Sequence, residues 1–290
     1  MNQPAGISPQ LASTQSAFNQ SAFNQSAFRD GLLAGRVAFV AGGTSGINLG
    51  IAKRFVELGA KVALIGRNYD KALLAARSIG TEAQSMAMSA DVRDYDVVRA
   101  ALQSTVEAWG PIDFVISGAA GNFVAPAAGM SANGFKVVVD IDLLGTFNVF
   151  RAAHDLVRKP GASMIAISAP QGSHPRTLQA HACAAKAGVN QLVRVLAMEW
   201  GREGIRVNAI SPGPIAGTEG MARLAPTPEA TAARIARIPL RRYGELHDVA
   251  ESAVFLCSQS AAYVNGTVLD CDGGASLGDA SDREIGQGIA

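Results

Sequence analysis

The 290-residue chain has few cysteines, no long apolar run and almost no net charge. Its three cysteines are an odd number without metal-type spacing, so we expect a reduced, cytoplasmic protein with neither a disulfide framework nor a metal site. No stretch of about 18 apolar residues is present, which predicts no membrane association through a spanning helix. Lys and Arg number 25 against 24 Asp and Glu, a balance that lacks the basic surface needed for nucleic-acid binding. The amino-terminal sequence does not resemble a secretory signal, and residues 287–290 do not form a peroxisomal address.

The first 30 residues differ in composition from the rest of the chain. They are rich in Ser, Gln, Asn and Ala and repeat a pentapeptide from Ser16 onward, as SAFNQ, SAFNQ and SAFRD. A five-residue period matches no solenoid, and three copies are too few to bury a core. We therefore expect residues 1–30 to form a disordered or loosely docked arm.

From residue 31 to 290, short β-rich apolar runs alternate with helical stretches, and no linker interrupts them. The expected strands cover 36–41, 61–65, 84–88, 113–116, 164–168, 206–210 and 267–269. The expected helices between the first four strands cover 46–58, 69–79 and 95–109. Strands separated by helices pair in parallel through right-handed crossovers. The pattern predicts one α/β domain of the Rossmann type, a doubly wound parallel sheet of about seven strands with helices on both faces.

A glycine-rich turn over residues 42–50 (GGTSGINLG) separates the first expected strand from the first expected helix. Glycines allow the backbone to approach a pyrophosphate, which the helix N-terminus then holds through its N–H groups and its dipole. The alternative is an ordinary strand-to-helix turn, but the strand-turn-helix context favours a dinucleotide site. The candidate cofactor-binding residues of this turn are Gly42, Thr44, Ser45, Gly46 and Ile47.

The end of the second expected strand indicates which dinucleotide binds. It reads Gly66-Arg67-Asn68, with no carboxylate before Asp70 to accept a ribose hydroxyl. Arg67 and Asn68 are therefore predicted to face the extra phosphate of NADP, although Arg67 as a solvated surface charge is the alternative. NADPH/NADP+ is the expected cofactor. Asp91 and Val92, just past the third expected strand, are placed to meet the adenine, with a helix N-cap as the alternative for Asp91.

From about residue 31 to 274 the chain resembles the short-chain dehydrogenase/reductase family. The resemblance is carried by the glycine-rich turn, Asp91-Val92, the run SGAAG at 117–121, Lys186 on a helix and the run PGPI at 212–215. It implies that Ala119, Ala120, Lys186, Pro212, Gly213, Ile215 and Thr218 complete the dinucleotide site. The last glycine of the family's turn is replaced by Asn48, which puts the local helix packing in doubt more than cofactor binding.

The chain departs from the family at the proton donor. Members typically reduce a carbonyl, with a tyrosine four residues before the lysine as the acid and a serine thirteen residues before that tyrosine. Here Ala182 and Ala169 stand at those positions, and Asp142 stands in place of the family's asparagine. Ser168, one position early on a strand, is expected to point to the opposite face. No tyrosine of the chain is followed by a lysine four residues later, so none has the spacing of the family's acid. The four tyrosines are Tyr69, Tyr95, Tyr243 and Tyr263.

One branch of the family, the peroxisomal-type 2,4-dienoyl-CoA reductases, lacks the tyrosine, and this chain resembles it at 119–123, 139–148, 179–187 and 213–220. The resemblance implies NADPH-dependent reduction of 2,4-dienoyl-CoA thioesters in fatty-acid β-oxidation. Hydride adds at the distal carbon and charge spreads to the thioester oxygen as a dienolate, so no alkoxide has to be protonated. Asp142 and Lys186 are the expected catalytic residues, which hold a water that protonates the carbon beside the thioester. The alternatives are a helix residue bonded to its neighbours for Asp142 and a ribose ligand in an inactive enzyme for Lys186.

The same resemblance assigns acyl-CoA contacts. They fall on Arg67, Arg93, Phe123, Ser131, Ala132, Asn133 and Arg223. The guanidinium groups of these arginines suit the phosphates of CoA. The alternative is that the arginines are ordinary surface residues and that Phe123 is an ordinary core residue. His181, one helical step of about 100° from the vacated tyrosine position, is expected to pack rather than act as the acid.

Two further expectations concern the second half of the domain. Residues 217–239 are predicted to form a helical lid over the substrate. The apolar helix faces around Phe147 and Leu192 predict a homodimer or homotetramer. The functions that remain as alternatives are a reductase of another enoyl-CoA or carbonyl substrate and a catalytically inactive NADP-binding protein.

Overall fold

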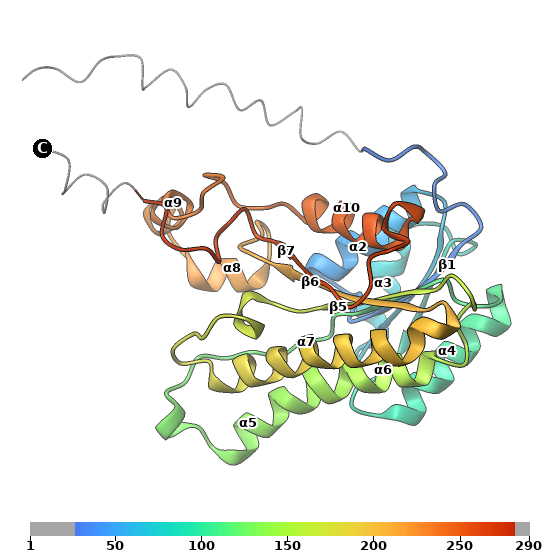
Figure 1. The fold of residues 1–290 in the computed structure, drawn as a ribbon, viewed down its shortest axis with the longest axis horizontal. Coiled ribbons are helices and arrows are strands. Elements are labelled where there is room, and N and C mark those ends of the chain that lie inside the picture. The colour runs from blue at the N-terminus through green and yellow to red at the C-terminus, as the bar shows by residue number, and fades with distance from the viewer. Residues whose placement is uncertain (1–26, 282–290) are drawn as a thin grey trace, which may run out of the picture.

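A computed structural model describes residues 27–281, except for the side chains of Glu219, Ala222 and Arg223. The expected arm at 1–30 falls almost entirely on residues 1–26, outside the described residues. Figure 1 shows the chain as a central sheet between two layers of helices.

Seven parallel strands form one sheet in the order β3-β2-β1-β4-β5-β6-β7. The strands are β1 (Val37–Ala41), β2 (Lys61–Gly66), β3 (Ser85–Ser89), β4 (Phe114–Ser117), β5 (Ser163–Ile167), β6 (Arg206–Pro212) and β7 (Val268–Cys271). Every residue of β1, β4 and β5 is buried, as expected for parallel strands covered on both faces. The predicted doubly wound sheet is confirmed, with strand ends shifted by one or two residues.

The helices divide between the two faces. They are α2 (Gly46–Glu57), α3 (Tyr69–Ile79), α4 (Tyr95–Trp109), α5 (Ala132–Val139), α6 (Gly145–Ala153), α7 (Ala180–Trp200), α8 (Glu219–Leu224), α9 (Pro228–Ala236) and α10 (Leu246–Cys257). Helices α2, α3 and α10 pack on one face, while α4, α6 and α7 pack on the other (Figure 1). Within the described residues, no helix is both long enough and apolar enough to span a bilayer.

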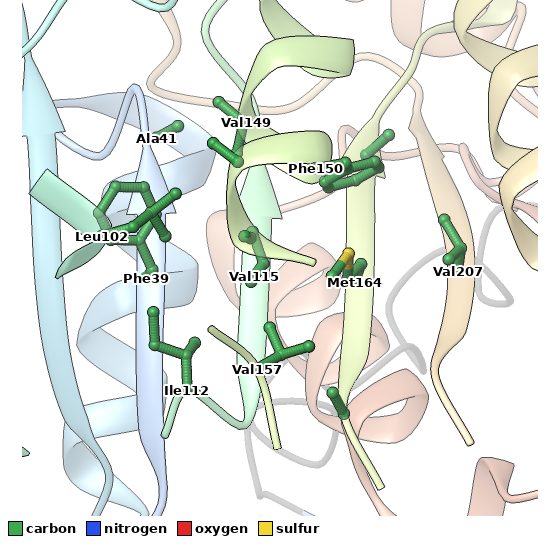
Figure 2. Close-up of a cluster of buried hydrophobic side chains, with 14 of the residues drawn as sticks. Phe39, Ala41, Leu102, Ile112, Val115, Val149, Phe150, Val157, Met164 and Val207 are labelled. Atoms are coloured by element: carbon green, nitrogen blue, oxygen red, sulfur yellow. The ribbon is translucent and has the colours of Figure 1, made fainter. Parts of the chain in front are cut away.

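The second of these faces contains the larger buried cluster. Figure 2 shows Phe39 of β1 and Met164 of β5 beneath Leu102 of α4 and Phe150 of α6. All four side chains are fully buried. This packing fixes the helices relative to the sheet, and it therefore fixes the loops that leave the carboxyl ends of the strands.

The strand order reverses between β1 and β4. At such a point the crossovers from two adjacent strands run to opposite faces and leave a crevice at the carboxyl edge of the sheet, where ligands bind in doubly wound folds. The glycine-rich turn follows β1, and the run 117–121 begins at the end of β4. The two segments predicted to hold the dinucleotide therefore flank the switch point.

Candidate active site

The turn between β1 and α2 has the shape of an anion cradle. Gly42 has φ +76°, and a Cβ there would lie 2.7 Å from the backbone nitrogen of Ala119, so only glycine fits. Gly46 has φ +57°, with open space where a side chain would be. Ser45 is the N-cap of α2 without a capping side-chain bond, and the first turn of α2 carries no acidic residue. Its N–H groups and dipole therefore suit a pyrophosphate.

Asn48 ties this turn to the loop after β4. Its side-chain amide donates to the carbonyl oxygens of Gly42 at 3.2 Å and Gly118 at 2.8 Å. A Cβ at Gly118 would lie within 2.5 Å of the Asn48 side chain, so the absence of a side chain at 118 makes room for the asparagine. The departure from the family's glycine is thus accommodated by packing.

The segments after β2 and β3 bring together two arginines, Arg67 and Arg93, and the carboxylate of Asp91. Arg67 is exposed at the end of β2, and the Asn68 side chain caps α3 by accepting from the Lys71 backbone at 2.8 Å. Asp91 accepts from Arg93 Nε at 3.0 Å and Nη2 at 2.6 Å. This hydrogen bond from Arg93 lowers the pKa of the Asp91 carboxyl, and the charge of Arg67 lowers it further.

The N-cap alternative for Asp91 is wrong. Helix α4 is capped by Asp94, whose Oδ1 accepts from the backbones of Asp96 at 3.1 Å and Val97 at 3.2 Å. Val92, the other expected adenine contact, is buried, and its carbonyl oxygen accepts from the Asn148 side chain at 2.9 Å. The segment at 91–92 is thus fixed between β3 and α6.

Asp142 and Lys186, the expected catalytic residues, form a buried ion pair. Lys186 Nζ lies 3.1 Å from Asp142 Oδ2, and it also donates to the carbonyl oxygen of Ile167 at 2.9 Å. The other carboxylate oxygen, Oδ1, accepts from the Gly121 backbone at 2.8 Å. Asp142 is 2% exposed and Lys186 is 8% exposed. Four segments thus converge here: the turn before α6, the helix α7, the end of β5 and the loop after β4.

Asp142 lies in a π-helical turn, Asp140–Leu144, that joins α5 to α6. Its backbone carbonyl accepts from Thr146 Oγ1 at 2.7 Å, which supports the wider turn. Such turns insert one residue into a helix and recur at functional sites. Nothing in the sequence indicated this turn, or the Gly121 N–H and the Ile167 carbonyl, as parts of the site.

The positions that the family fills with tyrosine and serine have no hydroxyl here. Ala182 is buried on α7, and Ala169 follows β5. The neighbouring Ser168 is buried and donates to Asn190 Oδ1 at 2.5 Å, so its hydroxyl is already engaged. The pair of Asp142 and Lys186 therefore remains the candidate acid–base group of the site.

Of the residues predicted to contact the substrate, Phe123, Ser131, Ala132 and Asn133 lie at or beside the N-terminal ends of α5 and α7, while Arg67 and Arg93 follow β2 and β3. The Phe123 ring is 39% exposed and its centroid lies 4.2 Å from that of His181, which is fully buried. Ser131 caps α5 by accepting from the Gly134 backbone at 3.0 Å, and Ala132 and Asn133 begin that helix. The side chain of Arg223, in α8, lies outside the described part of the chain.

A hydrogen-bonded chain of amides holds the backbone beside Phe123. Asn122 Nδ2 donates to Gln179 Oε1 at 3.2 Å, and Gln171 Nε2 donates to the same oxygen at 2.9 Å. This chain links the loop after β4 to the segment between β5 and α7. It was not predicted from the sequence, because its members are brought together only by the sheet.

The loop after β6 leaves the same carboxyl edge of the sheet as the loops after β1 and β4. Gly213 allows a close approach, since a Cβ there would lie 2.5 Å from the Cβ of Asp272. Ile215 is buried, and Thr218 Oγ1 donates to its carbonyl oxygen at 2.8 Å. Helices α8 and α9 follow within the expected lid segment, at the same end of the molecule as the start of α5 (Figure 1). An open cavity of about 520 Å³ there is lined by Ala216, Gly217, Thr218, Met221, Ala225, Thr231 and Tyr243.

Comparisons with known proteins agree with this geometry. The family model described as enoyl-(acyl carrier protein) reductase matches residues 41–276. The chain is 41% identical over 261 residues to a peroxisomal 2,4-dienoyl-CoA reductase, (3E)-enoyl-CoA-producing, of Danio rerio, covering 89% of this chain and 87% of the relative. It is 44% identical over 251 residues to the protein of the same description in Saccharomyces cerevisiae, covering 85% and 86%.

A solved structure gives the same result. A short chain dehydrogenase from Bacillus anthracis superposes with a TM-score of 0.74 at 37% identity, over 83% of this chain and 96% of that one. The resemblance found in the sequence is confirmed. The chain therefore belongs to the short-chain dehydrogenase/reductase family, whose members are oxidoreductases that use a nicotinamide cofactor.

Proposed function

We propose that the chain is an NADPH-dependent reductase of 2,4-dienoyl-CoA thioesters in fatty-acid β-oxidation. The observation that carries this proposal is the buried pair of Asp142 and Lys186 beside Ala182, which occupies the position of the usual proton donor. The names of the fish and yeast relatives support the substrate class and a (3E)-enoyl-CoA product. A site with alanine at the family's tyrosine position suits a substrate that is protonated at carbon rather than at an alkoxide.

In the proposed reaction, the residues of the chain hold the cofactor and order the water that supplies the proton. A bound NADPH supplies the hydride, which adds at C5 of the dienoyl thioester and leaves a dienolate. Gly42, Thr44, Ser45, Gly46 and Ile47 hold the pyrophosphate, and Lys186 holds the nicotinamide ribose. Asp142 and Lys186 order a water that protonates C2, so the remaining double bond lies between C3 and C4.

The rest of the site binds the cofactor and the acyl-CoA. The adenine half of the cofactor contacts Arg67, Asn68, Asp91 and Val92. The nicotinamide half contacts Ala119, Ala120, Pro212, Gly213, Ile215 and Thr218. The thioester and the CoA contact Arg67, Arg93, Phe123, Ser131, Ala132, Asn133 and Arg223, while α8 and α9 close over the acyl chain as a lid.

An absorbance assay tests the function directly. Full-length protein mixed with NADPH and 2,4-hexadienoyl-CoA should lose the absorbance of both chromophores. A panel with a trans-2-enoyl-CoA and a 3-oxoacyl-CoA separates the proposed reaction from reduction of another thioester. Folded protein that binds NADPH but turns over none of these thioesters contradicts the proposal and indicates an inactive NADP-binding protein.

Arg67 is expected to determine the preference for NADPH. Replacing Arg67 with alanine removes a charge-assisted contact to the 2′-phosphate, so KM for NADPH should rise about 10-fold or more. KM for NADH, which lacks that phosphate, should stay nearly constant. Arg77→Ala, which removes another exposed arginine from the last turn of α3, is the matched control. Equal changes in KM for the two cofactors would show that Arg67 does not read the phosphate.

We further propose a homodimer or homotetramer in the cytoplasm. Exposed apolar side chains on α6 and α7 support assembly, among them Phe147 (41% exposed) and Met198 (84% exposed), whereas Leu192 is partly buried against the core. Light scattering measures the mass of the assembly.

The proposed cytoplasmic location is supported by the three cysteines, all free, which suit a reducing compartment. Microscopy of the tagged chain separates a cytoplasmic location from the peroxisomal one that the names of the fish and yeast relatives state.

A further inference from the structure

His181 is buried in the first turn of α7 without the hydrogen bonds that its ring needs. Its exposed fraction is 0%, and neither Nδ1 nor Nε2 has a partner. Among the described residues, five buried side-chain nitrogen or oxygen atoms lack a partner, and two of them belong to this one ring. Buried polar atoms are almost always paired, so the imidazole calls for an explanation.

Stability does not supply that explanation. A buried polar group without a partner destabilises the folded state, whereas an aliphatic side chain of similar size would fill the same space without this cost. The contacts of the imidazole ring are therefore the next evidence for its role. Its aromatic neighbour is Phe123, one of the expected substrate contacts, at 4.2 Å between centroids and 43° between ring planes.

The Phe123 ring is held at its tip as well. Its Cζ lies against the first turn of α5, where a Cβ at Gly134 would be only 3.3 Å away. The preceding residue, Asn122, is bound to Gln179, two residues before His181. His181 therefore packs against a phenyl ring whose loop and tip are held by other segments. Phe123 is 39% exposed and is thus accessible to a ligand.

We propose that His181 is a positioning residue that sets the tilt of the Phe123 ring. Phe123, two residues after the Gly121 N–H that binds Asp142, then offers the conjugated acyl chain a flat surface in one orientation. A flat imidazole permits fewer orientations of the phenyl ring than a branched aliphatic side chain would. This inference rests on the proposed function, because the contact between Phe123 and the acyl chain belongs to that proposal.

Two substitutions separate positioning from simple packing. His181→Leu should raise KM for 2,4-hexadienoyl-CoA about 5- to 10-fold, because it removes the aromatic pair. It should leave Kd for NADPH nearly unchanged and should not lower Tm, since two unpaired nitrogens disappear. His181→Phe restores a flat ring and should bring KM back toward the wild-type value. If His181→Leu is not recovered as folded protein, His181→Met takes its place.

A double-mutant cycle then tests whether His181 acts through Phe123. Phe123→Leu alone should raise KM, and adding His181→Leu to it should produce little further change, because the ring to be positioned is gone. A wild-type KM in His181→Leu overturns the inference. So does an equal loss in His181→Phe, or two effects that multiply. A wild-type chain that binds NADPH but does not reduce the dienoyl thioester overturns the proposed function, and this inference with it.

Discussion

Replacing Asp142 with alanine is expected to lower kcat for dienoyl-CoA reduction by about 100-fold or more, the usual scale for a positioned proton transfer. Asp142 is the group that both accepts from the Gly121 backbone and pairs with Lys186. Without it, Lys186 keeps its bond to the Ile167 carbonyl but no longer has a carboxylate with which to orient a water. Kd for NADPH, measured by fluorescence titration, should change little.

Two asparagine variants show whether the charge of Asp142 matters. Asp142→Asn keeps the shape of the side chain and an oxygen for the Gly121 N–H, but it loses the negative charge. We expect kcat of this variant to fall nearly as far as in the alanine variant. Asp140→Asn is the matched control, because Asp140 is in the same π-helical turn but forms its ion pair with Lys136. Wild-type kcat in Asp142→Asn would contradict the proposed acid–base role.

Much of the fold could be predicted because its signals are local. The predicted helices 69–79 and 95–109 coincide with α3 and α4, whose N-caps, Asn68 and Asp94, stand directly before them. The strands followed from apolar runs between helices, although their ends depend on which neighbouring residues pair. The glycine-rich turn after β1 followed from its glycines, since the φ values of +76° at Gly42 and +57° at Gly46 favour that residue.

The supporting contacts of the site could not be predicted in the same way. The Gly121 N–H and the Ile167 carbonyl are backbone atoms, and every residue type offers such atoms, so no sequence signal distinguishes them. The π-helical turn adds one residue to a helix without any change in composition. The N-cap predicted as the alternative for Asp91 was wrong because Asp94, three residues later, is the cap and Arg93 binds Asp91. Each of these contacts depends on tertiary packing rather than on local preference.

Lys186→Met is expected to affect both activity and stability. The variant should lose roughly 1,000-fold in kcat/KM, since one substitution removes the partner of Asp142 and the proposed ligand of the nicotinamide ribose. It should also unfold more easily, because Asp142, 2% exposed, is left as a buried carboxylate without its cation. Breaking a buried ion pair in this way costs about 3 kcal/mol, which corresponds to a fall in Tm of about 6–12 °C.

The double variant Asp142→Asn/Lys186→Met separates these two effects. It leaves no uncompensated charge in the site, so its Tm should recover most of the loss seen in Lys186→Met. Its activity should stay as low as that of the single variants, because neither half of the pair is present to order the water. Scanning calorimetry and the absorbance assay measure the two quantities on the same protein. A Lys186→Met variant with wild-type Tm would show that Lys186 does not compensate the charge of Asp142. That result would contradict a mechanism in which the two residues act as an ion pair.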